Sequence, residues 1–478
     1  MSLGTQAMVE APLRGARRAW RLVRWPLAAV ALLAVALVLA NARDEKLSTQ
    51  ARAMLAPPPA RYPDRENLFV LLAGLDAPAG QSPLAAGEAN IAAYRRVVTE
   101  HLPLRGMSPE EVGKTPGSAR LTVTADLPQW DVLTSSIWES VRTAHAQMAA
   151  WSSANRVLLD RYTALAASKG YEEEPLRSSI GLFYPVPRSL RALYLASVAD
   201  AVQSGTGAER RAAIGSLAAD AALWRRMLQG EGTLVSKMVA TASLHADFIL
   251  LADMIEDRSV PLEQIEGGAA AVLEPWPVDS WKIGNGFSTQ YRRWSAELSD
   301  ASEDPEHFLD ALSLDWLQRR STDFGRPFLK PNATRNLQLR ILEPLIAAAD
   351  GDPARYPENA RAYADWYDRL ASRTFPAILY NPIGKRLLFL GGPGFLDYPL
   401  RVYDVAAFQR LVVLCYQLRA RSVAPAEVPG FMAAHPEWST HPVERAPFAW
   451  DARSGVIEII PRAKPQPGRR FGIRIVGS

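Results

Sequence analysis

The sequence predicts a mainly α-helical protein. We expect a single N-terminal transmembrane helix, then a multi-helix exported domain (a bundle or irregular solenoid) with a small C-terminal antiparallel β element. Three observations predict this class. A basic segment precedes an uncharged apolar run near the N-terminus. Apolar residues then recur every three or four positions, the helical period, through most of the chain. Only about the last hundred residues combine β-rich segments with turn residues.

The N-terminal anchor has a cytoplasmic basic segment, residues 1–24, and a transmembrane helix, residues 25–41, that contacts the lipid bilayer. From Leu22 to Ala40 the apolar run is nineteen residues long, interrupted only by Arg24. At about 1.5 Å per residue it spans roughly 28 Å, close to a bilayer core of about 30 Å. Basic flanks stay in the cytoplasm, so we expect a single-pass protein of the bacterial inner membrane with residues 43–478 in the periplasm. Five arginines form the flank: Arg14, Arg17, Arg18, Arg21 and Arg24.

Two other interpretations of this segment stay open. Ala40-Asn41-Ala42 fits the small-x-small pattern that precedes a signal-peptide cleavage site, so the chain could be cleaved after Ala42. The long basic region and the length of the apolar run favour an uncleaved signal anchor. Arg17-Arg18 is also compatible with a twin-arginine signal, but Trp20-Arg21 follows where that signal requires a bulky apolar pair.

Charge and cysteine content exclude some classes of protein. The net charge of +4 comes from residues 1–42, because the remaining chain carries 49 basic and 49 acidic residues. We therefore expect no nucleic-acid partner. The single cysteine, Cys415, cannot form an internal disulfide, and its apolar neighbours predict a buried small side chain rather than a reactive thiol. No second uninterrupted apolar run of eighteen residues occurs.

Residues 42–65 form a Pro-rich tether, in which Pro57-Pro58-Pro59 favours polyproline II. Residues 66–374 form the helical periplasmic domain. Short polar connections between its longer helices imply antiparallel neighbours. The expected helices cover residues 66–75, 84–99, 133–169, 190–202, 208–228, 234–255, 261–273, 287–298, 305–320, 333–349 and 353–372, with a further short helix beginning at Ser108.

Residues 375–478 form a C-terminal helix plus a small β-sheet subdomain. We expect loops at residues 381–385 and 391–394, because both combine proline with glycine. Residues 404–421 have the pattern of an amphipathic helix. The segments 447–450, 455–460 and 471–476 are rich in β-formers, and Asp451–Gly455 forms a hairpin turn between the first two. The sequence therefore predicts an antiparallel sheet of two or three strands packed on helix 404–421.

The tail also carries a resemblance. Asn381-Pro382-x-Gly384-Lys385 precedes a helix with Arg410-Leu411. A Pro-x-x-x-x-Pro-Phe-x-Trp-Asp segment, residues 442–451, follows it. This order resembles the C-terminal part of uncharacterised, membrane-anchored bacterial envelope proteins, over roughly the last hundred residues. His441 and Arg445 stand where those tails have Asp and Gly. The resemblance implies an envelope location and brings no known activity.

No residue pattern identifies a catalytic site, and we expect no cofactor and no bound metal. The chain lacks H-E-x-x-H, G-x-S-x-G and Ser-x-x-Lys motifs. The segment Gly106 to Thr115 has the wrong glycine spacing for a phosphate-binding loop. We expect His245, on an apolar helix face, to be a satisfied core histidine. His435 and His441, with Glu437 between them, are expected to be solvated loop histidines rather than metal ligands.

Three further features have a structural and a functional interpretation. Tyr171-Glu172-Glu173-Glu174 is expected to be a solvated turn. Trp276, Trp281, Trp294 and Trp316 could line a glycan or peptide groove, but core packing is the better expectation. A carboxylate pair for glycan hydrolysis could be drawn from many acids, and spacing selects none. The sequence favours a non-enzymatic helical binding or scaffold module of the cell envelope. The alternative is a hydrolase of peptidoglycan or another envelope glycan with an unrecognised carboxylate pair.

Overall fold

The computed structural model describes residues 7–99, 120–123, 127–128, 130–133, 136–174, 188–303, 328–374, 379–390, 394–464 and 468–475. The chain is mainly helical, as predicted, and ends in a small antiparallel sheet. The expected helix at residues 305–320, the expected helix start at Ser108 and the segment Gly106–Thr115 lie outside the described residues.

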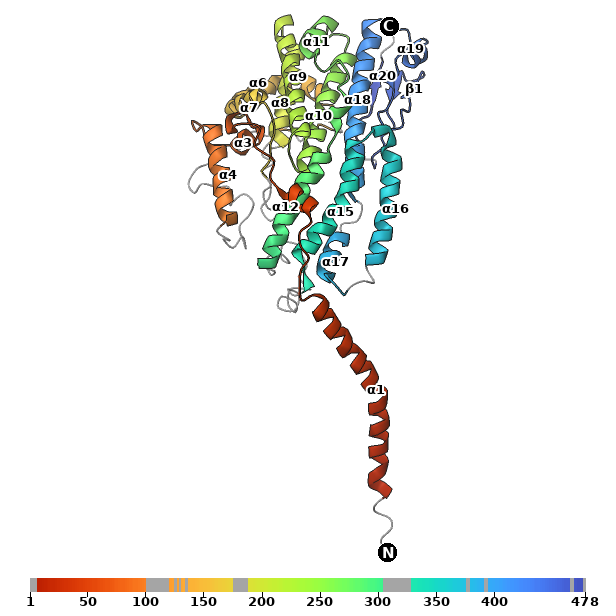
Figure 1. The fold of residues 1–478 in the computed structure, drawn as a ribbon. Helices are drawn as coiled ribbons and strands as arrows, with labels where there is room; N and C mark the ends of the chain where they lie inside the picture. The colour runs from red at the N-terminus through yellow and green to blue at the C-terminus, as the bar shows by residue number, and fades with distance from the viewer. Residues whose placement is uncertain are drawn as a thin grey trace. The chain divides into compact units, whose positions relative to one another are not determined.

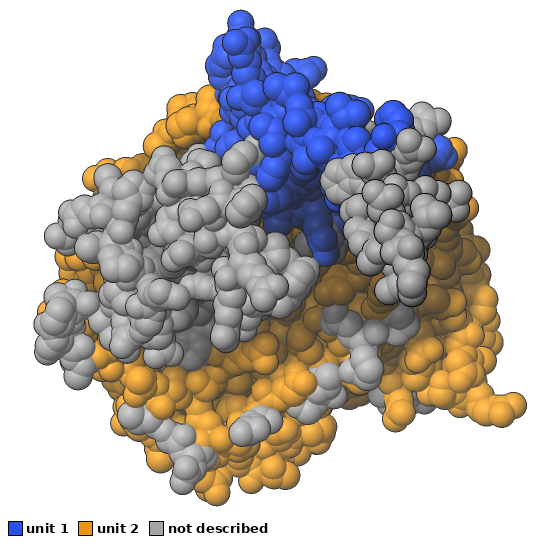
Figure 2. Space-filling model, turned by 90° about the horizontal axis from the view of Figure 1, so that it is seen from below, with its two compact units in different colours: residues 1–53, 298–340, 366–392 blue, residues 54–297, 341–365, 393–478 orange. Residues whose placement is uncertain are grey.

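The chain divides into two compact units, coloured separately in Figure 2. Unit 1 gathers three segments that are distant in sequence: Met1–Ala53, Leu298–Arg340 and Trp366–Gly392. Unit 2 contains Met54–Glu297, Ile341–Asp365 and Pro393–Ser478. The units are described separately below.

Unit 2 is built around α10 (Leu234–Glu256), which packs between α9 (Gly207–Gln229) and α18 (Asp397–Ala420). Figure 1 shows these three helices side by side, with α8 (Arg188–Ser204) against α9. Thr206 starts α9 with a capping box: the Thr206 hydroxyl accepts from the Glu209 backbone amide, and the Glu209 carboxylate accepts from the Thr206 backbone amide. The predicted apolar face of α9 is confirmed, because all five of its residues are buried: Ile214, Leu217, Ala221, Trp224 and Leu228.

The remaining elements of unit 2 surround this core. One expected helix, residues 133–169, is divided at Asn155, which ends one helix and precedes the next. The other helices of unit 2 are α3 (Leu68–Ala73), α4 (Pro83–Thr99), α6 (Ile137–Ala154), α7 (Arg156–Ala164), α11 (Leu262–Ala269), most of α12 (Gly284–Glu303), α19 (Val428–Ala434) and α20 (Pro436–Ser439). Helix α15 (Pro331–Asp350) and helix α16 (Tyr356–Thr374) each contribute residues to both units.

The C-terminal sheet is confirmed. Strands β1 (Ala449–Asp451), β2 (Val456–Glu458) and β3 (Gly472–Arg474) form one antiparallel sheet in that order. Gly455 takes a positive φ of 67° in the turn between the first two strands. Ile457 and Ile473 pair directly and are fully buried. Strand β3 contacts α18 and α10, so the sheet packs on the predicted helix.

Unit 1 contains α1 (Ala7–Ala40), most of α2 (Thr49–Leu55) and α17 (Pro382–Leu390). The expected loop at residues 381–385 is wrong, because α17 begins at Pro382. Proline suits the first position of a helix, where no amide hydrogen is needed, and Asn381 precedes it with a φ of 50°. Part of the predicted tether is also structured, since residues 49–55 form α2.

The helical period of residues 234–255 predicts an apolar face that begins with Val235, Met238 and Ala242, and this face is wrong in the N-terminal half of α10. Val235 is 45% exposed, whereas Ser236, Lys237 and Thr241 are buried. Hydrogen bonds explain the inversion: the Lys237 ammonium donates to the carbonyl of Leu228 (2.7 Å) and to that of Gly230 at the end of α9. Buried polar groups with partners can therefore occupy positions that a hydrophobic pattern assigns to solvent.

Exposure separates the two most apolar helices. By length and composition alone, α10 could cross a membrane, but 83% of its apolar window is buried inside the structure. Residues Arg24–Ala40 of α1 form a shorter apolar helix, and all of its described side chains are exposed except half-buried Leu37. The exposed large residues there are Trp25, Leu27, Val30, Leu32, Leu33, Val35, Val38 and Leu39.

Candidate functional site

A cluster of buried charges lies in the core of unit 2. The Arg191 guanidinium from α8 donates to Asp220 Oδ2 of α9 (3.3 Å), to Asp247 of α10 and to the Ser243 carbonyl (2.7 Å). Arg191, Asp220 and Asp247 are 7%, 3% and 1% exposed. The Tyr162 hydroxyl donates to Asp220 Oδ1 at 2.8 Å. Two carboxylates therefore share one cation away from water, an arrangement that can hold a proton.

Burial raises the pKa of Asp247 well above its usual range; Arg191 opposes this shift and Asp220 adds to it. Asp247 Oδ2 has no hydrogen-bond partner among the described residues. Asp247 also lines a small cavity whose other walls are mainly apolar and which has room for about one water molecule. A buried acid with a raised pKa beside a second carboxylate marks a candidate site, but a cavity of this size cannot admit a polymer segment.

A second buried cluster joins residues 171–174 to the start of α10. The Glu173 carboxylate, 5% exposed, accepts from the Thr233 amide (2.9 Å) and from the hydroxyls of Ser236 and Tyr171. The expectation of a solvated turn is therefore wrong for Tyr171 and Glu173. Burial lowers the pKa of the adjacent Lys237 to about 7. Serine, lysine and carboxylate lie together here, but Ser236 and Lys237 are fully buried, so no substrate reaches them.

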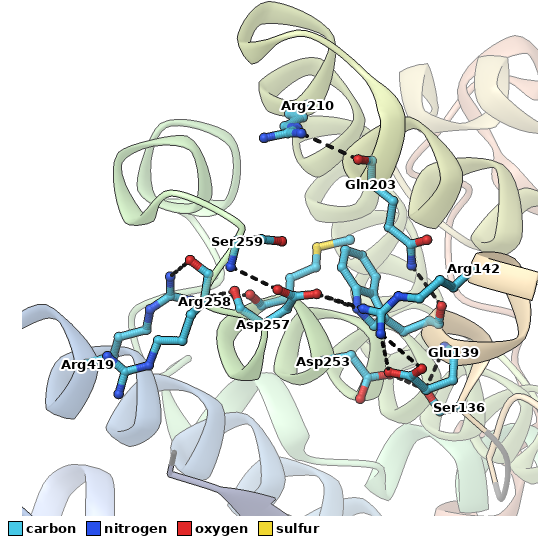
Figure 3. A network of polar contacts seen from close by, with 12 residues as sticks. Ser136, Glu139, Arg142, Gln203, Arg210, Asp253, Asp257, Arg258, Ser259 and Arg419 are labelled. Atoms are coloured by element: carbon cyan, nitrogen blue, oxygen red, sulfur yellow. Dashed lines mark hydrogen bonds and ion pairs between the residues drawn. The ribbon is translucent and has the colours of Figure 1, made fainter. Parts of the chain in front are cut away.

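A third network lies at the C-terminal end of α10 and is drawn in Figure 3. The Asp257 carboxylate accepts from the Trp138 indole (3.1 Å) and from Arg142 (2.9 Å), both on α6. Arg419 of α18 donates to the carbonyls of Ile255 (2.7 Å) and Val260. The Ile255 carbonyl lies in the last turn of α10, where carbonyls lack intrahelical partners, and Val260 lies in the connection that follows. The network therefore caps α10 and holds α6 and α18 against it.

The histidines divide between core and surface. His245 is a core histidine, as predicted, because it is 0% exposed and its Nε2 pairs with the Arg470 carbonyl at 2.9 Å. It is only partly satisfied, since its buried Nδ1 has no hydrogen-bond partner among the described residues. The expectation for His441 is wrong. It is 2% exposed, pairs with Asp404 Oδ1 at 3.1 Å, and accepts from the Val443 amide at 3.0 Å. The Nδ1 of His441 thus orders the start of the turn that contains Arg445, which stands where the similar tails have glycine.

His435 is half-buried, and its Nδ1 lies 3.1 Å from Oε1 of the exposed Glu437. His101 and His307 lie outside the described residues. Over the described part of the chain, no group of three or more His, Cys, Asp or Glu side chains could hold a metal ion.

Core packing accounts for two of the four singled-out tryptophans. Trp276 and Trp281 stack at 5.4 Å and are 7% and 3% exposed. Trp294 is half-buried against Phe395, and Trp316 lies outside the described residues. Cys415 is buried, as predicted. Sequence reasoning missed the surface stack in which Trp438 lies against His435, although the two residues are only three positions apart.

Unit 1 has a polar cluster where α1 ends, which we call the collar: Asn41, Asp44, Glu45, Thr334, Asn336 and Asn381. Asn41, 3% exposed, accepts from the Asn381 amide at 2.9 Å and donates to the Leu379 carbonyl. Asn381 in turn donates to the Thr334 hydroxyl at 3.0 Å. Sequence pattern could not predict this cluster, since Asn41 and Asn381 are 340 positions apart.

Comparison with known proteins adds no relative. A scan against protein-family models, a search of curated proteins and a search of solved structures each found no match. The resemblance of the tail to bacterial envelope proteins therefore stays a prediction.

Proposed function

We propose that the chain is an inner-membrane-anchored periplasmic protein that serves as a non-enzymatic helical binding or scaffold module of the bacterial cell envelope. The exposed apolar surface of α1 carries the proposal. Eight large apolar side chains between Trp25 and Leu39 are each more than half exposed. A stretch of that length and composition loses its contact with water when it enters a bilayer.

The orientation follows from the arginines that precede this surface, because basic residues next to a span stay in the cytoplasm. The proposal that the module is non-enzymatic rests on the burial of the candidate ionisable and nucleophilic side chains. Asp247, Ser236 and Lys237 are all buried, and the cavity beside Asp247 is about the size of one water molecule. Such groups stabilise a fold without meeting a substrate.

Reporter fusions test the location. Alkaline phosphatase fused after Ser478 should be active in cells, and a cytoplasm-only fluorescent reporter fused there should be dark. The opposite pattern would remove the periplasmic assignment. For the module function, in-cell crosslinking of the anchored full chain should yield the same envelope partner in repeated preparations. Recovery of no crosslinked product would count against it.

A hydrolase of peptidoglycan or another envelope glycan is the second candidate, and the raised pKa of Asp247 beside Asp220 is the observation that favours it. Asp247→Asn would then abolish release of fragments from peptidoglycan by the purified chain. If the parent chain itself leaves the polymer unchanged, this candidate loses its basis.

A further inference from the structure

The end of α1 continues into the rest of unit 1 with no linker between them. The helix extends to Ala40, and the next residue, Asn41, already belongs to the collar. Its side-chain amide donates both to Leu37 of α1 at 2.8 Å and to the Leu379 carbonyl of unit 1. One buried side chain therefore joins the last helical turn to the folded unit.

The residues after Asn41 are also held by the collar. Asp44 caps the start of α15, because its carboxylate accepts from the amides of Asn332 (2.8 Å) and Ala333 (3.1 Å). Glu45 Oε2 accepts from the Asn336 amide group at 3.2 Å. Both acidic side chains are thus engaged by unit 1, while the flanking cations Arg43 and Lys46 are exposed.

An apolar side chain lies beside this junction. Leu379 is 43% exposed, and it is the only large apolar residue of unit 1 that is exposed outside α1 in the described part of the chain. The Leu379 carbonyl accepts a hydrogen bond from Asn41, the residue after α1. Leu379 therefore lies close to the end of the apolar helix, where Val38 and Leu39 are exposed. An exposed leucine next to an apolar helix end, flanked by cations, suits the boundary between acyl chains and anionic headgroups.

We propose that unit 1 rests directly on the outer surface of the bilayer, with Leu379 inserted at the headgroup boundary and Arg43 and Lys46 against anionic phospholipid. The proposal depends on the membrane anchoring proposed above. In place of a domain that a Pro-rich tether holds off the membrane, it gives unit 1 a fixed orientation to the membrane.

The test uses the full chain in nanodiscs of phosphatidylcholine and phosphatidylglycerol, in a Cys415→Ala background that leaves no other thiol. An environment-sensitive dye is attached to Leu379→Cys, and lipids with a nitroxide on the acyl chain serve as quencher. The dye should emit at shorter wavelength than in detergent, and the nitroxide lipid should quench it. Ala42→Cys, next to Asn41, reports on the same surface if the Leu379 variant does not fold.

Two controls separate the possible failures. Leu33→Cys, inside the apolar part of α1, should be quenched whenever the anchor enters the bilayer. If it is quenched while residues 379 and 42 are not, the surface contact is wrong and the anchor stands; if none is quenched, both proposals fall. Twelve Gly/Ser residues inserted between Ala40 and Asn41 keep the bonds from Asn41 to Leu379 and Asn381 but add about 20 Å of flexible chain. That insertion should abolish quenching at residue 379 and leave it unchanged at residue 33.

Discussion

Arg191 shows how a single buried side chain can govern stability. Replacing it by methionine leaves Asp220 and Asp247 in the core without their shared cation. Removing one partner of a buried ion pair costs about 3–5 kcal/mol, because the remaining charge stays desolvated. We therefore expect Arg191→Met to lower the free energy of unfolding by that amount in urea titrations.

Arg142→Met is the matched control. Arg142 also pairs with a carboxylate, Asp257 at 2.9 Å, but its side chain is 53% exposed. Exposed pairs contribute about 0–1 kcal/mol, so this variant should unfold close to the parent. Equal losses in the two variants would show that burial of the Arg191 cluster has no special energetic role.

His245 predicts an acid limit to stability. Burial lowers the pKa of His245 to about 3, whereas an unfolded histidine titrates near 6.5. Between these values the unfolded chain binds the proton and the folded chain does not, so stability falls as pH drops from about 6.5 toward 3. The contribution is at most about 1.4 kcal/mol per pH unit.

His245→Gln should remove that part of the pH dependence, since glutamine does not titrate. The measurement is the urea midpoint at several pH values between 4 and 7. His145→Gln, at a side chain that is 60% exposed, is the matched surface substitution. A slope that is the same in His245→Gln and the parent would contradict the assignment.

Sequence pattern could predict some of these residues and not others. His245 and Cys415 sit among apolar neighbours at helical spacing, so burial followed from the pattern. His441 and Lys237 are just as buried, but their partners, Asp404 and the end of α9, come from other elements. The burial of a polar residue that lies off the predicted apolar face is therefore predictable only when its partner is known.

At the scale of elements, the apolar period was sufficient for the central helices. It predicted residues 208–228 as a helix together with the buried face of α9, whereas the capping box of Thr206 and Glu209 was not predicted. The hairpin turn at Gly455 likewise fixed the pairing of β1 with β2. Prediction failed at α17, where proline and glycine suggested a loop. Gly384 lies inside that helix, at a position that requires glycine because an added Cβ would collide with the Thr334 hydroxyl. Sequence spacing cannot show this contact.

Gly87 tests close helix packing between α3 and α4. A Cβ at Gly87 would overlap the Val70 carbonyl, which is backbone and cannot turn aside. Gly87→Ala should therefore destabilise the fold by about 1–3 kcal/mol, as overpacking does. In contrast, the nearest atom to a Cβ at Gly215 in α9 is 3.9 Å away.

Gly215→Ala is the control for helix propensity. Alanine is about 0.5–1 kcal/mol better than glycine inside a helix, so this variant should melt at a higher temperature than the parent. Thermal unfolding of both variants should give opposite signs. A stabilised Gly87→Ala would mean that α3 and α4 can separate freely.

Cys415 should report on the opening of α18. It is 3% exposed, and burial raises the pKa of its thiol well above the usual range. Thiolate is the reactive form, so a maleimide should label native protein far more slowly than protein in urea. A background variant, Cys415→Ala, should take up no label in either state. Rapid labelling without denaturant would show that α18 is not held in the core.

At the scale of the whole molecule, two arrangements lay beyond sequence reasoning. The Arg191 cluster draws residues from α7, α8, α9 and α10, so it exists only once those helices pack. Unit 1 draws on three segments that a reader of the sequence would place in different domains. The proposed membrane anchor, by contrast, rests on composition alone, because an apolar run between charged flanks predicts a membrane span without tertiary contacts.

The same anchor gives a prediction for the mature protein. Cleavage after Ala42 requires residues 40–42 to reach a peptidase active site as an accessible segment. In the structure Ala40 ends a helix, and Asn41 is 3% exposed and bonded to Leu379 and Asn381. We therefore expect the protein to keep residues 1–42 and to stay with the membrane after a high-salt wash. Ala42→Leu, which removes the small residue that cleavage needs, should change the intact mass only by the substitution itself. A mature N-terminus at Arg43 in the parent, lost in Ala42→Leu, would replace the anchor with a cleaved signal and a released periplasmic domain.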